Sequence, residues 1–503
     1  MNAHPGQPYN PLSSSLRDAK QQGYSCPGIA WPLSMPAVLR FSGFALVFFI
    51  GLGPSSAAEK IELEQAINYA LTQNRQLALS ALFTESTTLG VTRANLQFEP
   101  SYRPEVSLGT TDGESSASYG IRASKKLISG TELSTRVTRW RDDAQAGAED
   151  YRTSVEVEIA KPIFRNAGAL IHEEPLMQAA NDLATARRRY ELQRVDLVID
   201  VVEKYEEILR LSRQLHADEQ ALKRTAALYR LTRAREAVGR TKRVDTLRVE
   251  FQHGQTLSRL SVNREILANA QQDFAELLGF APVTVFDLTP TVLLEYNNLQ
   301  PDEAIRTALE NRLDYAQTLQ DYQDSARGVR IARRRLLPGM KLFARYNRNV
   351  DNTLSTSTIA DSSDGIWFFG VAADTDFNRS RENTALRGAN IDKTAALQDI
   401  KALELSIDLQ VRQHIRAYER ARAEIEIAEK NLTLATARLK FARRLFDLGR
   451  GDNFSVTDAE DALFQAKTQL FSTRAQASVK GYQLSRALGT LIAAPSDLKP
   501  LTL

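Results

Sequence analysis

Cysteine is almost absent from the chain, which has only one in 503 residues. Cys26 stands in the segment QGYSCPG with no apolar run before it, so it does not fit a lipid-attachment site. It also lies in the part of the chain that we expect to be removed as a leader. The mature protein is therefore expected to have no disulfide, no thiolate zinc site and no cysteine nucleophile.

Histidine is scarce as well, and its spacing argues against a metal site. None of the five histidines has another four residues away, and the HExxH pattern is absent. A Walker loop and a GxGxxG turn before a helix are absent too, so nucleotide binding is not expected. The sequence predicts no cofactor, no metal and no enzyme activity. The five are His4, His172, His216, His253 and His414.

Neither sign of charge dominates the chain. Sixty-four Lys and Arg against 61 Asp and Glu leave a formal net charge of +3, which does not call for nucleic acid or an anionic surface. The arginine runs at 187–189 and 333–335 could suggest such contacts. Solvated helix faces paired with the abundant acidic residues are the interpretation that we favour, so no nucleic-acid partner is expected.

Long apolar runs are also missing, apart from one near the N-terminus. Residues 41–53 read FSGFALVFFIGLG, follow Arg40 and precede the small residues of SSAA, an order typical of a secretory signal peptide. Cleavage after Ala58 would make Glu59 the first mature residue, so 1–58 is interpreted as a leader. The run begins late, and Met35 is an alternative start to Met1.

Beyond the leader no run of about 18 apolar residues recurs, so a membrane-spanning helix is not expected. The backbone polar groups of any part that enters a bilayer must then be satisfied between strands. A closed barrel is the arrangement that achieves this.

What the sequence does have is an internal duplication. An offset of 210 residues relates Gly239 to Gly449, Arg240 to Arg450 and Glu250 to Glu460. With small insertions the match extends upstream, where Tyr205 faces Tyr418 at an offset of 213. We expect a first repeat at 59–295, a second at 296–495 and a tail at 496–503.

Each repeat is predicted to contain the same elements in the same order. A helix (about 62–98 and 302–336) ends at a proline, a polar β-rich section follows (about 102–164 and 340–377), and then come about 110 residues with little Pro or Gly. These last sections, about 170–280 and 380–489, are interpreted as long helical hairpins that turn at Gly239 and Gly449. An ordinary coiled coil would explain the helices equally well. Apolar residues on one heptad seam are Leu257, Leu260, Leu267, Phe274 and Leu278.

The β sections favour a membrane barrel. Val155, Val157 and Ile159 alternate with glutamates, and residues 342–346 alternate in the same way, as in strands with one apolar and one polar face. An ordinary half-buried sheet would also alternate, but a signal peptide and the lack of covering helices favour the barrel. Residues 128–130 leave room for an extra hairpin, so the spanning strands of the first repeat stay unassigned.

This layout, with ALTQNRQLALS at 70–80 and AKPIFRNAG at 160–168, resembles the TolC family of outer-membrane efflux proteins. The resemblance implies a mostly α fold with a β-barrel part: a homotrimer in which each subunit gives four strands to a twelve-stranded outer-membrane barrel and four helix tracks to a periplasmic α-helical barrel. It further implies a periplasmic adaptor (a membrane fusion protein) and an inner-membrane transporter as partners, in a tripartite efflux or type I secretion system.

The resemblance also implies a pore gate at Asp245 and Asp458. Two positions depart from the family pattern, since Gly451 stands where a linking arginine is expected and Ser455 where a second gate aspartate is expected. A purely structural alternative makes Asp245 a helix N-cap and Ser455 with Asp458 a capping box.

Three further residues are candidates for the gate network, namely Lys242, Arg450 and Asp452. The turns at 238–244 and 448–456, with Gly239, Arg240, Gly449 and Arg450, are the expected docking tips for the adaptor.

The function that these features predict is a passive exit duct across the periplasm and outer membrane. The alternative is a periplasmic coiled-coil adaptor or structural protein without a channel. Drugs, metal ions and unfolded proteins are all compatible cargo, because nothing in the sequence selects among them.

Overall fold

A computed structural model describes residues 59–111, 114–143, 149–296, 299–352, 365–451 and 453–500. Residues 56–503 form one compact unit, which is the subject of the description below. The expected signal peptide, with its apolar run at 41–53, lies outside the described residues. So does Asp452, one of the candidates for the gate network.

The two repeats share one order of two helices, strands and a long helical hairpin, and the first repeat has further short elements and two more strands. The first holds β1 (Glu59–Ile61), α2 (Leu63–Gln73), α3 (Arg75–Leu96), β2 (Ser101–Thr111), β3 (Glu114–Lys126), β4 (Glu132–Asp143), β5 (Glu149–Pro162), α4 (Ala169–His172), α5 (Glu174–Ala237), α6 (Arg243–Leu278) and β6 (Phe286–Leu288). The second holds α7 (Pro301–Asn311), α8 (Leu313–Arg335), β7 (Gly339–Asn352), β8 (Ile366–Asp374), α9 (Ser380–Asp447) and α10 (Asn453–Ala487).

The opening helix of each repeat is broken, where the sequence predicts one continuous helix. In the first repeat Asn74 separates α2 from α3, and its side chain accepts a hydrogen bond from the Leu77 N–H at 3.0 Å. Its amide also donates to the Leu277 carbonyl at 3.0 Å, which fastens the break to the end of α6. Asparagine therefore acts as an N-cap inside the expected helix. Arg312 separates α7 from α8 at the matching place.

The two repeats together form one antiparallel sheet, in the order β2-β3-β4-β5-β7-β8. This is six strands in the described chain, where the resemblance implies four per subunit. The two additional strands are β3 and β4, which are joined by the turn at 127–131 and pair along their full length. Gly130 has φ +85° in this turn, a conformation that favours glycine. The extra hairpin for which the sequence leaves room near 128–130 is therefore present.

The predicted alternation along the strands is confirmed by the register of β5 and β7. Val157 lies opposite Tyr346 and Ile159 opposite Ala344, so the apolar residues of both strands share one face. On the other face Glu158 lies opposite Arg345, and the two side chains form an ion pair. One face of the sheet is therefore mainly apolar and the other mainly charged, although Arg348 lies on the first face and Phe343 on the second.

A tyrosine at the matching place in each repeat joins a long helix to the backbone of a neighbouring segment. The Tyr205 hydroxyl on α5 lies 2.9 Å from the Ile61 carbonyl and 2.8 Å from the Thr289 carbonyl. Tyr418 on α9, its match in the second repeat, donates to the Leu294 carbonyl at 2.6 Å. Tyr205 is fully buried, so the bond also satisfies its hydroxyl.

The heptad seam expected on α6 is only partly correct. Leu260, Phe274 and Leu278 are buried as predicted. Leu257 is 54% exposed, so the seam is not buried along its whole length in a single chain. An exposed leucine on a long helix is available to a further partner.

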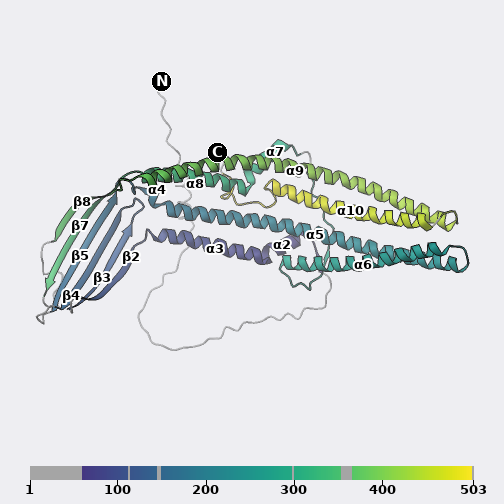
Figure 1. The fold of residues 1–503 in the computed structure, drawn as a ribbon, viewed down its shortest axis with the longest axis horizontal. Coiled ribbons are helices and arrows are strands. Elements are labelled where there is room, and N and C mark those ends of the chain that lie inside the picture. The colour runs from purple at the N-terminus through teal and green to yellow at the C-terminus, as the bar shows by residue number, and fades with distance from the viewer. Residues whose placement is uncertain are drawn as a thin grey trace, which may run out of the picture. The chain divides into compact units, whose positions relative to one another are not determined.

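Figure 1 shows the sheet at one end of the long helices and the two turns, between α5 and α6 and between α9 and α10, at the other. Within the described residues no helix combines the length and the apolar character that crossing a membrane requires.

Candidate functional site

The two hairpin turns have the same backbone geometry. Gly239 has φ +68° and Gly449 has φ +72°, and each follows the last turn of a long helix. In both turns the next residue closes a six-residue loop, since the Arg240 N–H donates to the Arg235 carbonyl at 2.8 Å and the Arg450 N–H to the Leu445 carbonyl at 2.9 Å. This is the usual way in which a left-handed residue ends a helix. The duplication seen in the sequence is thus a duplication of turn structure.

The contacts around Gly451 bear on its departure from the family pattern, in which an arginine is expected at this position. The Gly451 N–H donates to the Leu445 carbonyl at 3.0 Å, so in the second turn this carbonyl accepts from both Arg450 and Gly451. A Cβ at this position would lie 3.0 Å from the Phe446 nitrogen and 3.1 Å from the Leu445 Cβ. An arginine here would be crowded and would require the end of α9 to shift by a few tenths of an ångström.

Asp458, the first gate candidate, is paired within its own hairpin. Its carboxylate forms an ion pair with Arg438 on α9, and the Asp458 side chain is still 45% exposed. Helix α10 begins at Asn453, so Ser455 lies inside the helix and does not cap it. The capping-box alternative is therefore wrong, and the side chain of Asp458 is available to solvent.

Asp245, the second candidate, lies at the start of α6. Lys242 is the N-cap of this helix and Asp245 is its third residue, so the expectation that Asp245 caps the helix is wrong by three positions. Its carboxylate lies 3.6 Å from Arg248, one turn along. An acidic residue in a first turn also interacts favourably with the helix dipole. Asp245 and Asp458 thus belong to different hairpins, each beside an arginine of its own.

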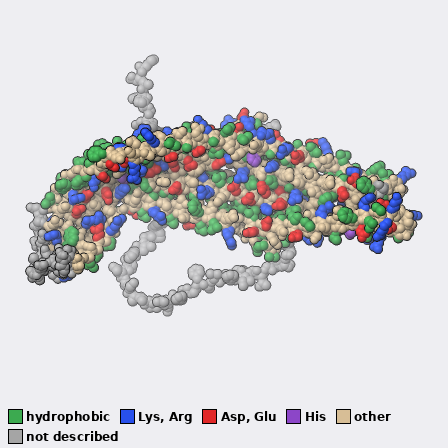
Figure 2. All heavy atoms as spheres, in the orientation of Figure 1, with side chains coloured by type: hydrophobic (Ala, Val, Ile, Leu, Met, Phe, Trp, Pro, Cys, Tyr) green, Lys and Arg blue, Asp and Glu red, His purple; other side chains and the backbone are tan. Residues whose placement is uncertain are grey.

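Basic side chains surround both turns. Arg240, Lys242 and Arg450 are all exposed, and Figure 2 shows Lys and Arg gathered over this end of the described chain. The Arg243 guanidinium lies 3.3 Å from the Glu236 carboxylate, which closes the first turn with an ion pair. The nearby Thr246 and then the adjacent Arg243 lower the pKa of the Glu236 carboxyl.

A buried carboxylate between the hairpins was not among the residues singled out from the sequence. Glu460 on α10 is 6% exposed and accepts a hydrogen bond from Arg224 Nε on α5 at 2.7 Å. It also forms an ion pair with Arg443 on α9. Glu250, its match in the first repeat, is exposed. The sequence duplication relates Glu460 to Glu250. It does not show that only Glu460 is buried, because burial depends on how the two repeats pack together.

Three arginine–aromatic contacts join the repeats close to the turns. Each pairs an arginine of the first repeat with a phenylalanine of the second, at 3.7 to 5.7 Å from guanidinium carbon to ring centroid. A guanidinium over a ring face is attracted by the ring quadrupole. The pairs are Arg235 with Phe446, Arg248 with Phe454, and Arg259 with Phe464.

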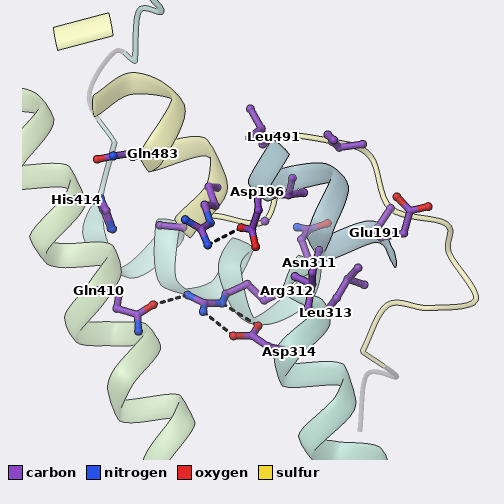
Figure 3. Close-up of a pocket in the computed structure, with 17 residues that line it drawn as sticks. Glu191, Asp196, Asn311, Arg312, Leu313, Asp314, Gln410, His414, Gln483 and Leu491 are labelled. Carbon is purple, nitrogen blue, oxygen red and sulfur yellow. Dashed lines mark hydrogen bonds and ion pairs between the residues drawn. The ribbon is translucent and has the colours of Figure 1, made fainter. Parts of the chain in front are cut away.

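A second candidate site is a cavity of about 510 Å³ where the repeats meet, far along the helices from the turns (Figure 3). It is lined by α5, α8, α9, α10 and the segment after α10. Arg312 lies across it, donating to Gln410 at 2.9 Å and to Asp314 at 2.6 and 3.0 Å. Arg486, which also lines the cavity, pairs with Asp196 at 2.6 Å. Both guanidinium groups are thus already neutralised.

His414 also lines this cavity. Burial lowers its pKa, and the nearby charges of Lys480, Arg486 and Arg312 lower it further, so the imidazole is neutral at pH 7. Within the described residues no group of three or more potential metal ligands lies together. We therefore interpret the cavity as part of the polar contact between the packed repeats.

The family expected from the sequence is also the one whose model matches part of the chain. Residues 304–490, most of the second repeat, match the family described as outer membrane efflux protein. This is a family of efflux proteins of the outer membrane rather than of enzymes, which agrees with the expected localisation. The chain has no match among curated proteins.

Solved structures extend the likeness to both repeats. The transmembrane channel protein CusC has a TM-score of 0.66 at 16% identity, over 87% of this chain and 95% of its own. The outer membrane protein VceC of Vibrio cholerae gives 0.66 at 15%, over 85% and 96%. The MtrE outer membrane channel of Neisseria gonorrhoeae, in its open state, gives 0.65 at 13%, over 85% and 89%. At these identities the likeness establishes a shared fold.

Proposed function

We propose that this protein is the outer-membrane exit duct of a tripartite efflux or type I secretion system. Three copies enclose one conduit, in which the sheets form a barrel in the outer membrane and the helices form a tunnel through the periplasm. Cargo passes through without chemistry, driven by an inner-membrane transporter and received through a periplasmic adaptor. The chain supplies walls, a gate and docking tips.

The observation that carries this proposal is the two-faced sheet. Its apolar face includes Val106 at 72%, Ile121 at 59% and Phe369 at 73% exposure, with none of the described helices covering it. Apolar area of this kind is stable only against lipid or another protein. The opposite face carries Arg345, Glu158 and other charged side chains, which fit a water-filled lumen.

We further propose that Asp458 forms an acidic ring at the periplasmic entrance, with Asp245 near it. Rotation about a threefold axis brings the three copies of one residue around a single point. Arg438 would then be the group that closes the gate, since it already pairs with Asp458. The ring would favour cations when that pair opens.

The two turns are proposed as the docking tips for the adaptor. They are matched in backbone geometry, so three subunits would present six similar tips. Arg240 and Arg450 are exposed there and offer charged donors to an acidic partner surface. Apolar side chains at the tips, such as Val238 at 68% and Leu448 at 65% exposure, add area for such a contact.

Cell fractionation tests the proposal. Outer-membrane fractions of cells that express the full chain should contain a trimer that runs intact in SDS and dissociates on heating. A soluble periplasmic monomer would contradict the duct and would favour the coiled-coil adaptor or structural protein instead.

A further inference from the structure

We propose that three copies of this chain close an eighteen-stranded barrel, with the β3–β4 hairpin as a full part of the membrane wall. The inference rests on the proposed function for the number of subunits, and on this chain's own sheet for the number of strands. Three sheets of six strands make eighteen. The interaction surface is the pair of open edges, β2 and β8, and the occupant of each edge is a second copy of this chain.

The two edges are suited to one another. β2 has 11 residues and β8 has nine, and both have the 9–11 residues that a membrane-spanning strand needs. Because the sheet is antiparallel throughout and has an even number of strands, β8 of one copy runs antiparallel to β2 of the next. Unpaired backbone groups at these edges could not stand in lipid, so the sheet is incomplete without its neighbours.

The β3–β4 hairpin carries the same apolar face as the strands around it. Tyr102 on β2 lies level with Ala123, Thr135 and Val157 on the next three strands, which follows from the successive registers. The exposed apolar residues of the hairpin alternate in step with that row. They are Tyr119 and Ile121 on β3, and Leu133 and Val137 on β4, at 37–59% exposure. A hairpin that folded into the lumen or projected away from the membrane would not need an apolar face in line with that of the neighbouring strands.

The opposite face of the hairpin is charged and bonded to its neighbour. Glu105 on β2 pairs with Arg122 on β3 at 2.6 Å and with Arg136 on β4 at 3.3 Å, so one carboxylate spans three strands. Ser107 and Ser118 are hydrogen-bonded at 2.7 Å on the same face. Charges at membrane depth face water in known barrels. The hairpin therefore places polar groups on the lumen side and apolar groups on the lipid side, as β5 and β7 do.

Arg139 lies on the apolar face, near the end of β4 that is distant from the helices. Its guanidinium lies over the Tyr151 ring at 4.8 Å. Arginine and tyrosine together are typical of the headgroup level of a membrane. This position thus marks the outer rim of the apolar band.

The turn of the hairpin is fastened to the start of the long helices. The Gly168 N–H donates to the Ser129 carbonyl at 3.2 Å. His172 on α4 packs against Gly130 so closely that a Cβ at Gly130 would lie 2.1 Å from its Nε2. That nitrogen also lies 2.7 Å from the Asn166 carbonyl. The hairpin is therefore held in line with the wall by contacts that do not depend on the membrane.

Eighteen strands also match the helical part in width. Strands about 4.8 Å apart and tilted by about 40° give a perimeter of about 110 Å for eighteen strands. Twelve helix tracks about 10 Å apart give about 120 Å. A twelve-stranded barrel at the same tilt would have about two thirds of the eighteen-stranded perimeter. The perimeters of the barrel and of the helical tunnel would thus be similar, so an eighteen-stranded barrel can continue the tunnel without a large change in width.

Spin labels on single cysteines test the membrane wall. The labels are placed in a Cys26→Ser chain. Those at Ile121→Cys and Val137→Cys should collide with oxygen dissolved in the lipid. Those at Ser118→Cys and Ser134→Cys should collide with a water-soluble nickel chelate. Val157→Cys and Ser154→Cys on β5 are the matched controls. The proposal requires the same reversal of accessibility on β3, β4 and β5. Nickel access at every hairpin position, with reversal kept on β5, would overturn it.

Disulfide cross-linking tests the edges. Cysteines at 102, 106 or 108 on β2 are combined with cysteines at 367, 369 or 371 on β8, and oxidation should give covalent trimers in one register and nothing larger. No cross-link in any register would overturn the edge pairing. The outer-membrane trimer itself is the readout for the proposed function. A trimer without hairpin reversal or edge cross-links defeats this inference alone, whereas absence of the trimer defeats the duct.

Discussion

Arg224 on α5 donates a hydrogen bond to the Glu460 carboxylate on α10 at 2.7 Å, although the two residues belong to different repeats. Arg443 pairs with the same carboxylate from α9. One buried acid thus holds three of the four long helices together near the turns. This contact fixes how one hairpin lies against the other, which is the relationship that opening a duct would have to change.

Loss of this acid should loosen the hairpins. Glu460→Ala leaves two arginines with 22% and 44% exposed side chains unpaired, so we expect a cost of about 1–3 kcal/mol and a lower melting temperature by circular dichroism. Glu250→Ala, at the equivalent exposed position of the first repeat, is the control and should leave the melting temperature unchanged. Equal effects of the two substitutions would refute a special role for Glu460.

The turn glycines should be required for their backbone conformation rather than for space. A Cβ meets nothing within 4 Å at Gly239 or at Gly254, but only Gly239 has positive φ. Gly239→Ala should therefore cost about 1–2 kcal/mol. Gly254→Ala, inside α6, should stabilise the helix by about 0.5–1 kcal/mol. Melting temperatures at one scan rate compare them, and opposite signs are the expected result.

Bulky residues at both turns test docking separately from folding. Replacing Gly239 and Gly449 together by tryptophan should abolish export while the trimer still assembles, because both glycines are exposed and a Cβ at either meets no neighbouring atom within 4 Å. Export at the wild-type level with assembled trimer would argue that the adaptor binds elsewhere.

Glu206 should make stability depend on pH. It is 4% exposed, and burial raises its pKa, which the hydrogen bond from Thr291 only partly offsets. Below the ordinary glutamate pKa both states hold the proton. As pH rises the unfolded state releases it first, so stability falls until the folded pKa is passed. Glu206→Gln should flatten this fall in melting temperature. Glu207→Gln, exposed and 3.5 Å from Lys204, should retain it.

Much of this fold was predictable because its signals are periodic. The repeat offset predicted two equivalent turns, and Gly239 and Gly449 indeed have the same geometry. Alternation predicted the faces of β5 and β7. The break at Asn74 was missed, because a capping asparagine within a helical pattern looks like any polar surface residue. The resemblance implies four strands per subunit whereas the sheet has six, and the sequence leaves the spanning strands of the first repeat unassigned, since the segment around Gly130 is compatible with a loop or a hairpin until its partners are known.

The site was less predictable than the fold. Asp458 and Asp245 were chosen by position, and both lie near the turns, but their arginine partners Arg438 and Arg248 were not foreseen. Glu460 was missed as a link because burial between repeats is a tertiary property. Sequence periodicity defines which face of each helix is apolar, but not which helix will lie against it.

The central claim is that the trimer is a conduit with Asp458 at its entrance, and single-channel recording in a planar bilayer tests it most directly. Purified trimer should give discrete current steps that favour cations. Asp458→Asn should reduce this selectivity, Asp458→Arg should reverse it or block the current, and Glu426→Gln, on the exposed surface of α9, should change nothing. If Asp458 only supports its ion pair with Arg438, Asp458→Asn would cost about 1 kcal/mol or less and leave selectivity alone. Inserted trimers that pass no current, in the wild type and in a variant lacking Arg438, would contradict the account.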